Sequence, residues 1–140
     1  MANRDGAVED LRVGLREVSR RLQREWGERM PDVTFAESTL LSAVQAHERA
    51  TMVDVARALR IDKSTASRQV AALERRGLLT RQALAGERRA QLLVLTPAGA
   101  DVLAAASDSW RASIRQRVDG WTDDELSQFV RLLQRYNDHA

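Results

Sequence analysis

The sequence predicts a mainly α-helical fold with a small β-hairpin, in which a winged helix-turn-helix domain lies between N- and C-terminal helices. Three observations support this prediction. Apolar residues recur every three or four positions over most of the 140 residues. Helix-capping residues stand at the start of several of these stretches. Between residues 78 and 95 the helical period gives way to two short apolar runs, which is typical of a hairpin.

The first element is an amphipathic helix over residues 8–29. Its apolar side consists of Val8, Leu11, Leu15, Val18 and Leu22. The helix ends before Pro31, because a proline pushes the residue before it out of the α-helical region. Thr34 and Glu37 have the spacing of a capping box, so a second helix begins there, and it ends near His47.

Two short helices follow, joined by a tight turn at residues 59–61. Thr51 caps the first of them and Asp62 caps the second. At about 100° per residue, the second helix has one apolar and one polar side. Its apolar side consists of Ala66, Val70 and Leu73, and its polar side includes Ser64, Arg68 and Arg75. A helix that packs on one side and presents hydroxyl and guanidinium groups on the other is suited to the major groove of DNA.

A hairpin follows this helix. Gly77 suits the position just past the helix end, and residues 78–84 and 91–95 are predicted strands. The turn between them carries Arg88 and Arg89 at its tip. A hairpin directly after a helix-turn-helix is a wing.

Two helices complete the chain. Thr96 and Pro97 open the first, with threonine at the N-cap and proline at the first helical position. Thr122 and Glu125 repeat the capping-box spacing and open the second. The apolar residues of these two helices are Val102, Ala105, Ala106, Trp110 and Ile114, then Leu126, Phe129, Val130, Leu133 and Tyr136.

Positive charge is concentrated in the middle of the chain. The whole sequence holds 22 Lys and Arg against 20 Asp and Glu, a net charge of +2. Residues 49–89 hold ten of the basic residues and four of the acidic ones, a net of +6, and the remainder sums to −4. A basic segment between neutral or acidic flanks favours a polyanion such as nucleic acid. The alternative is an ordinary solvated face.

Other classes of protein are excluded by what the sequence lacks. It has no Cys, which excludes disulfides, thiolate metal sites and thiol redox sensing. His47 and His139 are too few and too far apart in sequence for a metal site. We find no nucleophile with its base and no glycine-rich phosphate loop, and therefore predict no catalytic residue and no cofactor. With no long apolar run and a polar N-terminus, we expect a single cytoplasmic domain over 1–140 that contacts no membrane.

Several motifs resemble those of one family of regulators. They are Val53-Asp54-Val55-Ala56, the stretch from Ile61 to Arg68, the stretch from Leu73 to Arg81, Glu87-Arg88-Arg89, and the stretch from Leu93 to Gly99. Together with the order of helices they make the chain similar to the MarR family of winged helix-turn-helix transcriptional regulators along essentially its whole length. Two residues depart from the family pattern: Glu87 stands where the wing usually has Asp, and Gln69 where the recognition helix is usually aliphatic.

The predicted DNA-binding residues are Lys63, Ser64, Thr65, Ser67, Arg68, Arg75, Arg88 and Arg89. Hydroxyls near a helix start donate to phosphates and base edges, or else cap the helix. Arg68 has the fork geometry to pair with O6 and N7 of guanine, the alternative being phosphate contact alone. Arg88 and Arg89 suit the minor groove or phosphates, the alternative being solvating charge. Arg75 and Arg76 contact the DNA backbone or are solvated ends of the helix.

The apolar stripes at both ends exceed what a winged domain over 34–96 can cover. We therefore expect a homodimer held by terminal helices 8–29 and 97–138, as the resemblance also implies, that binds a palindromic operator in double-stranded DNA. The alternative is that the stripes form core within one chain.

The resemblance further implies a repressor that a small aromatic or phenolic ligand releases from DNA. The residues that could line its site are Trp26, Met30, Phe35 and Trp110, the alternative for each being core packing. A rival function is a winged-helix module for protein–protein interaction, whose basic helix binds an acidic partner without specific DNA readout. Steep salt dependence together with a preference for one palindrome would favour the regulator.

Overall fold

The computed structural model describes residues 3–83 and 91–138 and contains six helices and one two-stranded sheet within them. The element order is α1 (Arg4–Arg29), α2 (Phe35–Ala46), α3 (Met52–Leu59), α4 (Lys63–Arg75), β1 (Leu79–Ala83), β2 (Gln91–Leu95), α5 (Pro97–Arg117) and α6 (Asp123–Asp138). The chain forms two compact units, residues 1–106 and 107–140, with α5 running through the boundary. The predicted mainly α fold with a β-hairpin wing is confirmed.

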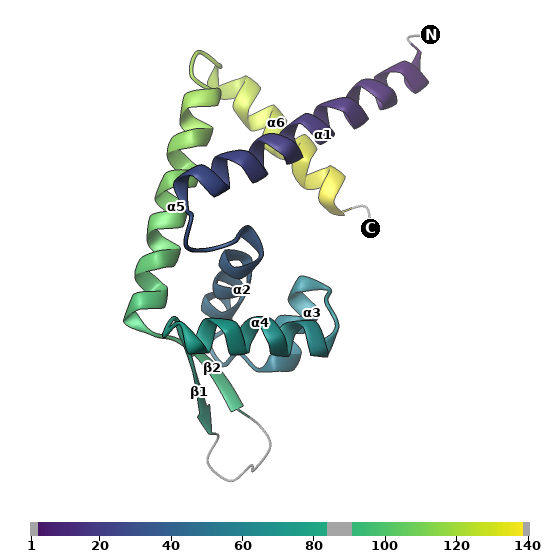
Figure 1. Cartoon of the computed structure of the whole chain (residues 1–140). Coiled ribbons are helices and arrows are strands. Elements are labelled where there is room, and N and C mark those ends of the chain that lie inside the picture. Colours follow the sequence, from purple (N-terminus) through teal and green to yellow (C-terminus); the bar gives the residue numbers. More distant parts are fainter. Residues whose placement is uncertain (1–2, 84–90, 139–140) are drawn as a thin grey trace. The chain divides into compact units, whose positions relative to one another are not determined.

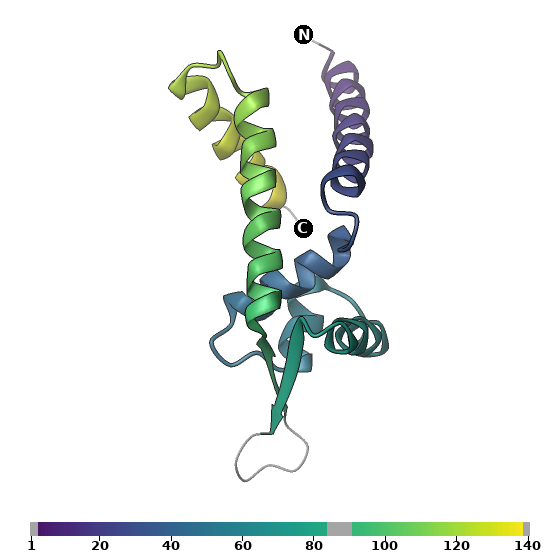
Figure 2. The same ribbon diagram turned by 60° about the vertical axis from the view of Figure 1, so that its left-hand side comes forward.

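The core of the first unit lies where α2, α3, α4 and the hairpin meet. Figure 1 shows the three short helices side by side, with β1 and β2 extending from them, and Figure 2 shows the same grouping after rotation. The largest fully buried side chains are Leu40, Leu41, Leu73, Leu79, Val55 and Val70. Each element of the group contributes to one continuous apolar cluster. This packing fixes α4 against its neighbours through one side only.

Local capping sets the helix starts, as the sequence predicts. Thr34 accepts a hydrogen bond from the N–H of Glu37, whose carboxylate accepts in return from the N–H of Thr34. Thr51 and Asp54 form the same reciprocal box at α3, so Asp54 completes a cap that was predicted for Thr51 alone. These hydrogen bonds from Thr51 hold the pKa of Asp54 below its ordinary value. Each box satisfies donors that the first turn of a helix leaves free.

The wing hairpin is antiparallel, with Leu79 opposite Leu95 and Ala83 opposite Gln91. Its base is extended by a contact that the sequence did not reveal. The N–H of Leu93 donates to the carbonyl of Ala50 at 2.8 Å, and Thr51 forms an isolated bridge with Leu92. The start of the helix-turn-helix is therefore hydrogen-bonded to the wing. Residues 84–90, which include the predicted wing tip, lie outside the described residues.

Gly99, in the first turn of α5, lies against the backbone at the start of the hairpin. A Cβ at position 99 would meet the carbonyl oxygen of Leu78 well inside van der Waals contact. That carbonyl cannot move freely, because it accepts from the N–H of Thr96 at 3.2 Å. The hydroxyl of Thr96 is also held, since it donates to the carbonyl of Gly77 at 2.6 Å. Only glycine allows this approach of helix to strand.

We expect Gly99→Ala to lower the free energy of unfolding by about 1–3 kcal/mol. The added methyl group would push the first turn of α5 away from the backbone of Leu78. Thermal unfolding followed by circular dichroism measures the effect. Gly14→Ala is the matched control, since a Cβ there meets nothing within 4 Å and alanine is the better helix former by about 0.5–1 kcal/mol. Equal midpoints for Gly99→Ala and the unaltered protein would contradict the prediction.

Helix α1 begins four residues before the predicted residue 8, because Asn3 supplies a local cap. Its side chain accepts from the N–H of Gly6 at 3.1 Å. The predicted start followed the apolar period, which begins only at Val8. None of the residues of α1, all of them described, is buried.

The second unit contains the end of α5 and all of α6. The predicted capping box is present, with the N–H of Thr122 donating to Glu125 at 2.8 Å and the N–H of Glu125 donating back at 3.2 Å. The rings of Trp121 and Phe129 meet edge to face, with centroids 5.6 Å apart. Helix α6, described throughout, has no buried residue, and Ile114 of the predicted apolar side of α5 is also exposed. Among the described helices, none is long and apolar enough to cross a membrane.

Candidate nucleic-acid interface

The outer side of α4 carries most of the predicted DNA-binding residues. Its inner side is closed, because Ala66, Val70 and Leu73 are each 0% exposed in the core. The exposed predicted residues are Lys63, Ser64, Ser67, Arg68 and Arg75, and Thr65 is half-buried. A rigid helix with a solvent-facing row of hydroxyl, ammonium and guanidinium groups is the arrangement that a recognition helix requires.

The start of α4 is organised around the carboxylate of Asp62. Its Oδ1 accepts from the N–H of Thr65 at 2.7 Å and from the hydroxyl of Ser64 at 2.6 Å. Arg68 donates to the hydroxyl of Thr65 at 3.4 Å. Ser64 therefore takes part in the helix cap, which is the alternative that the sequence analysis left open for it. A phosphate would compete for the same hydroxyl.

These hydrogen bonds lower the pKa of Asp62. The hydroxyl of Ser64, followed by the N–H of Thr65, stabilises the carboxylate and brings its pKa from 3.8 to about 2. Because the folded pKa is depressed, the cap contributes full stability above about pH 4, and this contribution is lost as the pH falls towards 2.

We therefore expect the stability difference between the unaltered protein and Asp62→Asn to shrink or reverse between pH 5 and pH 2. Asparagine is an equally good N-cap but does not titrate, so the comparison isolates the carboxylate from Asp54 and other acids. Urea unfolding at several pH values measures it. A stability difference that stays constant over this pH range would show that the charge of Asp62 does not contribute to the free energy of unfolding.

Other arginines of the basic segment form ion pairs within the chain. Arg81 on β1 pairs with Glu74 on α4, with 3.1 Å between Nε and Oε2. Arg76 binds Glu37 at 2.6 Å and also the carbonyl of Asp32. Arg76 at the end of α4 is therefore paired within the chain, although its side chain is still 37% exposed, and its contact with the DNA backbone stays a prediction. Neighbouring Arg75 remains exposed.

Three arginines were missed as candidates. Arg57 on α3 and Arg60 in the turn before α4 are exposed beside the recognition helix, and Arg60 has a left-handed backbone with φ 52°. In the sequence only their charge indicated them. Arg21 on α1 is half-buried, and its Nε has no hydrogen-bond partner, although Glu25 lies 3.8 Å away. Its spacing of four residues from Glu25 is that of an ordinary ion pair along one helix.

The predicted ligand residues are divided between the two units, and a site shared by them stays a prediction. Trp26 and Phe35 meet edge to face with centroids 5.5 Å apart, and Trp26 packs against the core. The indole N–H of Trp26 donates to the carbonyl of Val33 at 2.5 Å. Met30, the C-cap of α1, is half-buried, and Trp110 belongs to the second unit. For Trp26, core packing is therefore observed.

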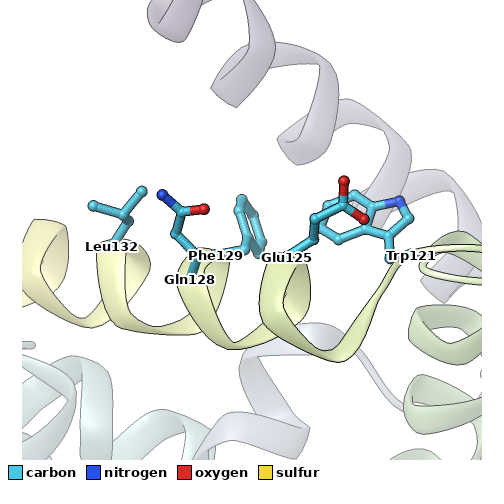
Figure 3. Close-up of a pocket in the computed structure, with 5 residues that line it drawn as sticks. All are labelled: Trp121, Glu125, Gln128, Phe129 and Leu132. Carbon is cyan, nitrogen blue, oxygen red and sulfur yellow. The ribbon is translucent and has the colours of Figure 1, made fainter.

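A surface groove of about 440 Å³ lies along α6 in the second unit. Its lining residues are Trp121, Glu125, Gln128, Phe129 and Leu132. Figure 3 shows these side chains projecting from the same side of the helix. They adjoin the predicted apolar stripe of α6, where Phe129 is 51% and Leu133 is 43% exposed. This face of the helix has no covering within its own unit.

The described residues contain no cluster of three or more potential metal ligands. His47 has its Nδ1 2.8 Å from the carbonyl of Ala43. His139, Arg88 and Arg89 lie outside the described part of the chain.

The fold and the outer side of α4 define a winged helix-turn-helix DNA-binding protein. Residues 32–90 match the MarR family. The chain is 32% identical to the uncharacterized HTH-type transcriptional regulator YxaD of Bacillus subtilis (strain 168) over 98 residues, which are 70% of this chain and 68% of YxaD. The chain belongs to the MarR family, whose members are transcription regulators rather than enzymes.

Solved structures show the same fold. BpsR of Bordetella bronchiseptica, whose DNA binding is regulated by 6-hydroxynicotinic acid, is 25% identical, with a TM-score of 0.73 over 91% of this chain and 98% of BpsR. MepR of S. aureus, solved as a complex with DNA, is 22% identical, with a TM-score of 0.77 over 90% of this chain and 95% of MepR.

Proposed function

We propose that this protein is a repressor that binds a palindromic operator in double-stranded DNA as a homodimer. The observation that carries the proposal is the exposed outer side of α4, whose residues Ser67, Arg68 and Arg75 face solvent while the opposite side is fully buried. Hydroxyls and Lys63 suit phosphates, and Arg68 suits a guanine edge. The proposed site also includes Arg88 and Arg89, which the sequence predicts at the tip of the wing. The relatives named above are bacterial proteins, and bacterial DNA lies in the cytoplasm, so we also propose a cytoplasmic location.

The terminal helices support a twofold arrangement of two copies of the chain. We propose that residues 34–96 form the winged domain and that residues 8–29 and 97–138 form the dimer interface. The exposed apolar residues that support this are Val8, Leu11, Leu15 and Val18 on α1 and Phe129, Val130, Leu132, Leu133 and Tyr136 on α6. Two recognition helices related by a dyad reach successive major grooves about 34 Å apart, which requires a palindrome.

We propose release by a small aromatic acid. Such a ligand needs apolar walls and a cation, and the half-buried part of α1 offers Trp26 and the guanidinium of Arg21. BpsR, a protein of this fold, responds to an aromatic acid. A ligand shifts the DNA equilibrium only by its preference for one arrangement, about 1.4 kcal/mol for each tenfold change.

The test begins with selection of bound fragments from genomic DNA by the purified full chain. The affinity for the best fragment is then compared with that for shuffled DNA over a range of salt. We expect one palindrome to be preferred and log affinity to fall by about 0.9 per phosphate contact with log salt. Aromatic acids are then screened for release of that fragment. Equal affinity for selected and shuffled DNA would overturn the proposal and favour a module that binds acidic proteins.

A further inference from the structure

Arg76 fastens the C-terminal end of α4 to a distant part of the same unit. Its guanidinium donates to Oε2 of Glu37 at 2.6 Å and to the backbone carbonyl of Asp32. Glu37, in the first turn of α2, is 39 residues away along the chain, and Asp32, in the α1–α2 loop, is 44 residues away. Two donations from one planar guanidinium fix direction as well as distance.

The acceptor Glu37 is itself held in place. It is the third residue of the α2 capping box, and the same Oε2 accepts from the N–H of Thr34 at 3.3 Å. The Glu37 side chain is only 19% exposed. One carboxylate is therefore shared by the start of α2 and the end of α4, so it has little freedom to follow Arg76 elsewhere.

The α1–α2 loop is held from its other side by α1. The indole N–H of Trp26 donates to the carbonyl of Val33 at 2.5 Å, and the ring packs edge to face on Phe35. Val33 is itself part of the core, 4% exposed. The loop thus receives a hydrogen bond from α1 at Val33 and another from the end of α4 at Asp32.

We propose that Arg76 is a positioning residue for DNA binding: by holding Glu37 and Asp32 it fixes the angle at which α4 meets the major groove. The inference rests on the proposed function of α4 as the recognition helix. Although its side chain is 37% exposed, Arg76 contributes to affinity without touching DNA, because Glu37 and Asp32 hold its guanidinium. Arg75 beside it is exposed and free to reach a phosphate. The two adjacent arginines therefore have different roles.

The test uses Arg76→Met, Glu37→Gln and the double variant in the full chain. Glutamine can still complete a capping box, so Glu37→Gln weakens the pair with Arg76 and spares the start of α2. In Glu37→Gln, the loss of an acidic charge should by itself strengthen DNA binding. We nevertheless expect both single variants to lose affinity for the selected operator, each by about 3- to 30-fold. The double variant should bind no more weakly than the weaker single variant.

Salt dependence separates positioning from direct contact. We expect Arg76→Met to leave the slope of log affinity against log salt unchanged, whereas Arg75→Ala should reduce it by about 0.9. Arg76→Lys should remain weak, because an ammonium keeps the charge but cannot make the forked contact. Glu48→Gln, a change at an exposed residue between α2 and α3, is the matched charge control and should not weaken binding.

Thermal unfolding of each variant checks that all are folded at the temperature of the binding assay. Stronger binding by Glu37→Gln, full recovery by Arg76→Lys, or variants that lose stability but keep operator affinity would overturn the inference. Failure of the proposed function has a different signature, since the unaltered protein would then prefer no DNA sequence.

Discussion

Arg68→Ala is expected to lower affinity for the selected operator by about 5- to 150-fold, which corresponds to the 1–3 kcal/mol of a bidentate arginine–guanine pair. The structure supports this expectation because Arg68 is exposed on the outer side of α4, one turn from the helix start. Its contact within the chain, to the hydroxyl of Thr65 at 3.4 Å, is long and easily exchanged for a base. Fluorescence anisotropy with labelled operator measures the loss.

Base reading and phosphate contact are separated by two further measurements. Affinity for shuffled DNA should fall far less than affinity for the operator, and Arg68→Lys should restore binding to shuffled DNA without restoring the preference. Arg24→Ala, which removes the same charge from an exposed position on α1, serves as the control and should have little effect on either. Equal losses on both DNAs for Arg68→Ala would show that Arg68 reads no base.

Leu133→Glu is expected to convert the proposed dimer to a monomer and to weaken operator binding by about 10²- to 10⁴-fold, because each half-site is then bound separately. Leu133 is 43% exposed in the single chain, within an apolar face that also holds Phe129 and Tyr136. A carboxylate in that face would be desolvated without a partner on association. Since α6, described throughout, contributes no buried residue, the winged unit should remain folded.

Sedimentation velocity at micromolar concentration measures the association, and the same samples are used for the DNA assay. Ser127→Glu is the matched control, because it adds the same charge to α6 at an exposed position about 120° around the helix from Leu133. That variant should remain dimeric. An unaltered protein that sediments as a monomer, or a Leu133→Glu variant that sediments as a dimer, would contradict the proposed interface.

Local signals explain how much of the fold could be predicted. The caps at Thr34, Thr51, Asp62 and Thr122 are confirmed because each is a contact among residues three positions apart. The same locality explains why α1 begins earlier than predicted. The apolar period of α1 begins only at Val8. The polar residues before it can still be helical, because the side chain of Asn3 caps the first turn and this cap is not part of the apolar pattern.

The candidate site, too, was predictable from the sequence only where local spacing determines it. The sequence placed Arg68 and Arg75 on the outer side of α4, because the inner side is fixed by the spacing of apolar residues. It could not distinguish Arg75 from Arg76, which are adjacent and chemically identical. Both are exposed, and only the contact of Arg76 with Glu37, 39 residues away, distinguishes them.

The amino-acid sequence by itself determined the helices, their caps, the hairpin, and which side of α4 faces outward. These follow from the backbone period and from hydrogen bonds that span a single turn. The tertiary structure alone decided that Ala50 is hydrogen-bonded to the wing, that Gly99 lies against Leu78, and that Arg76 holds the α1–α2 loop. Such contacts join residues remote along the chain, so they exist only after packing has brought those residues within reach.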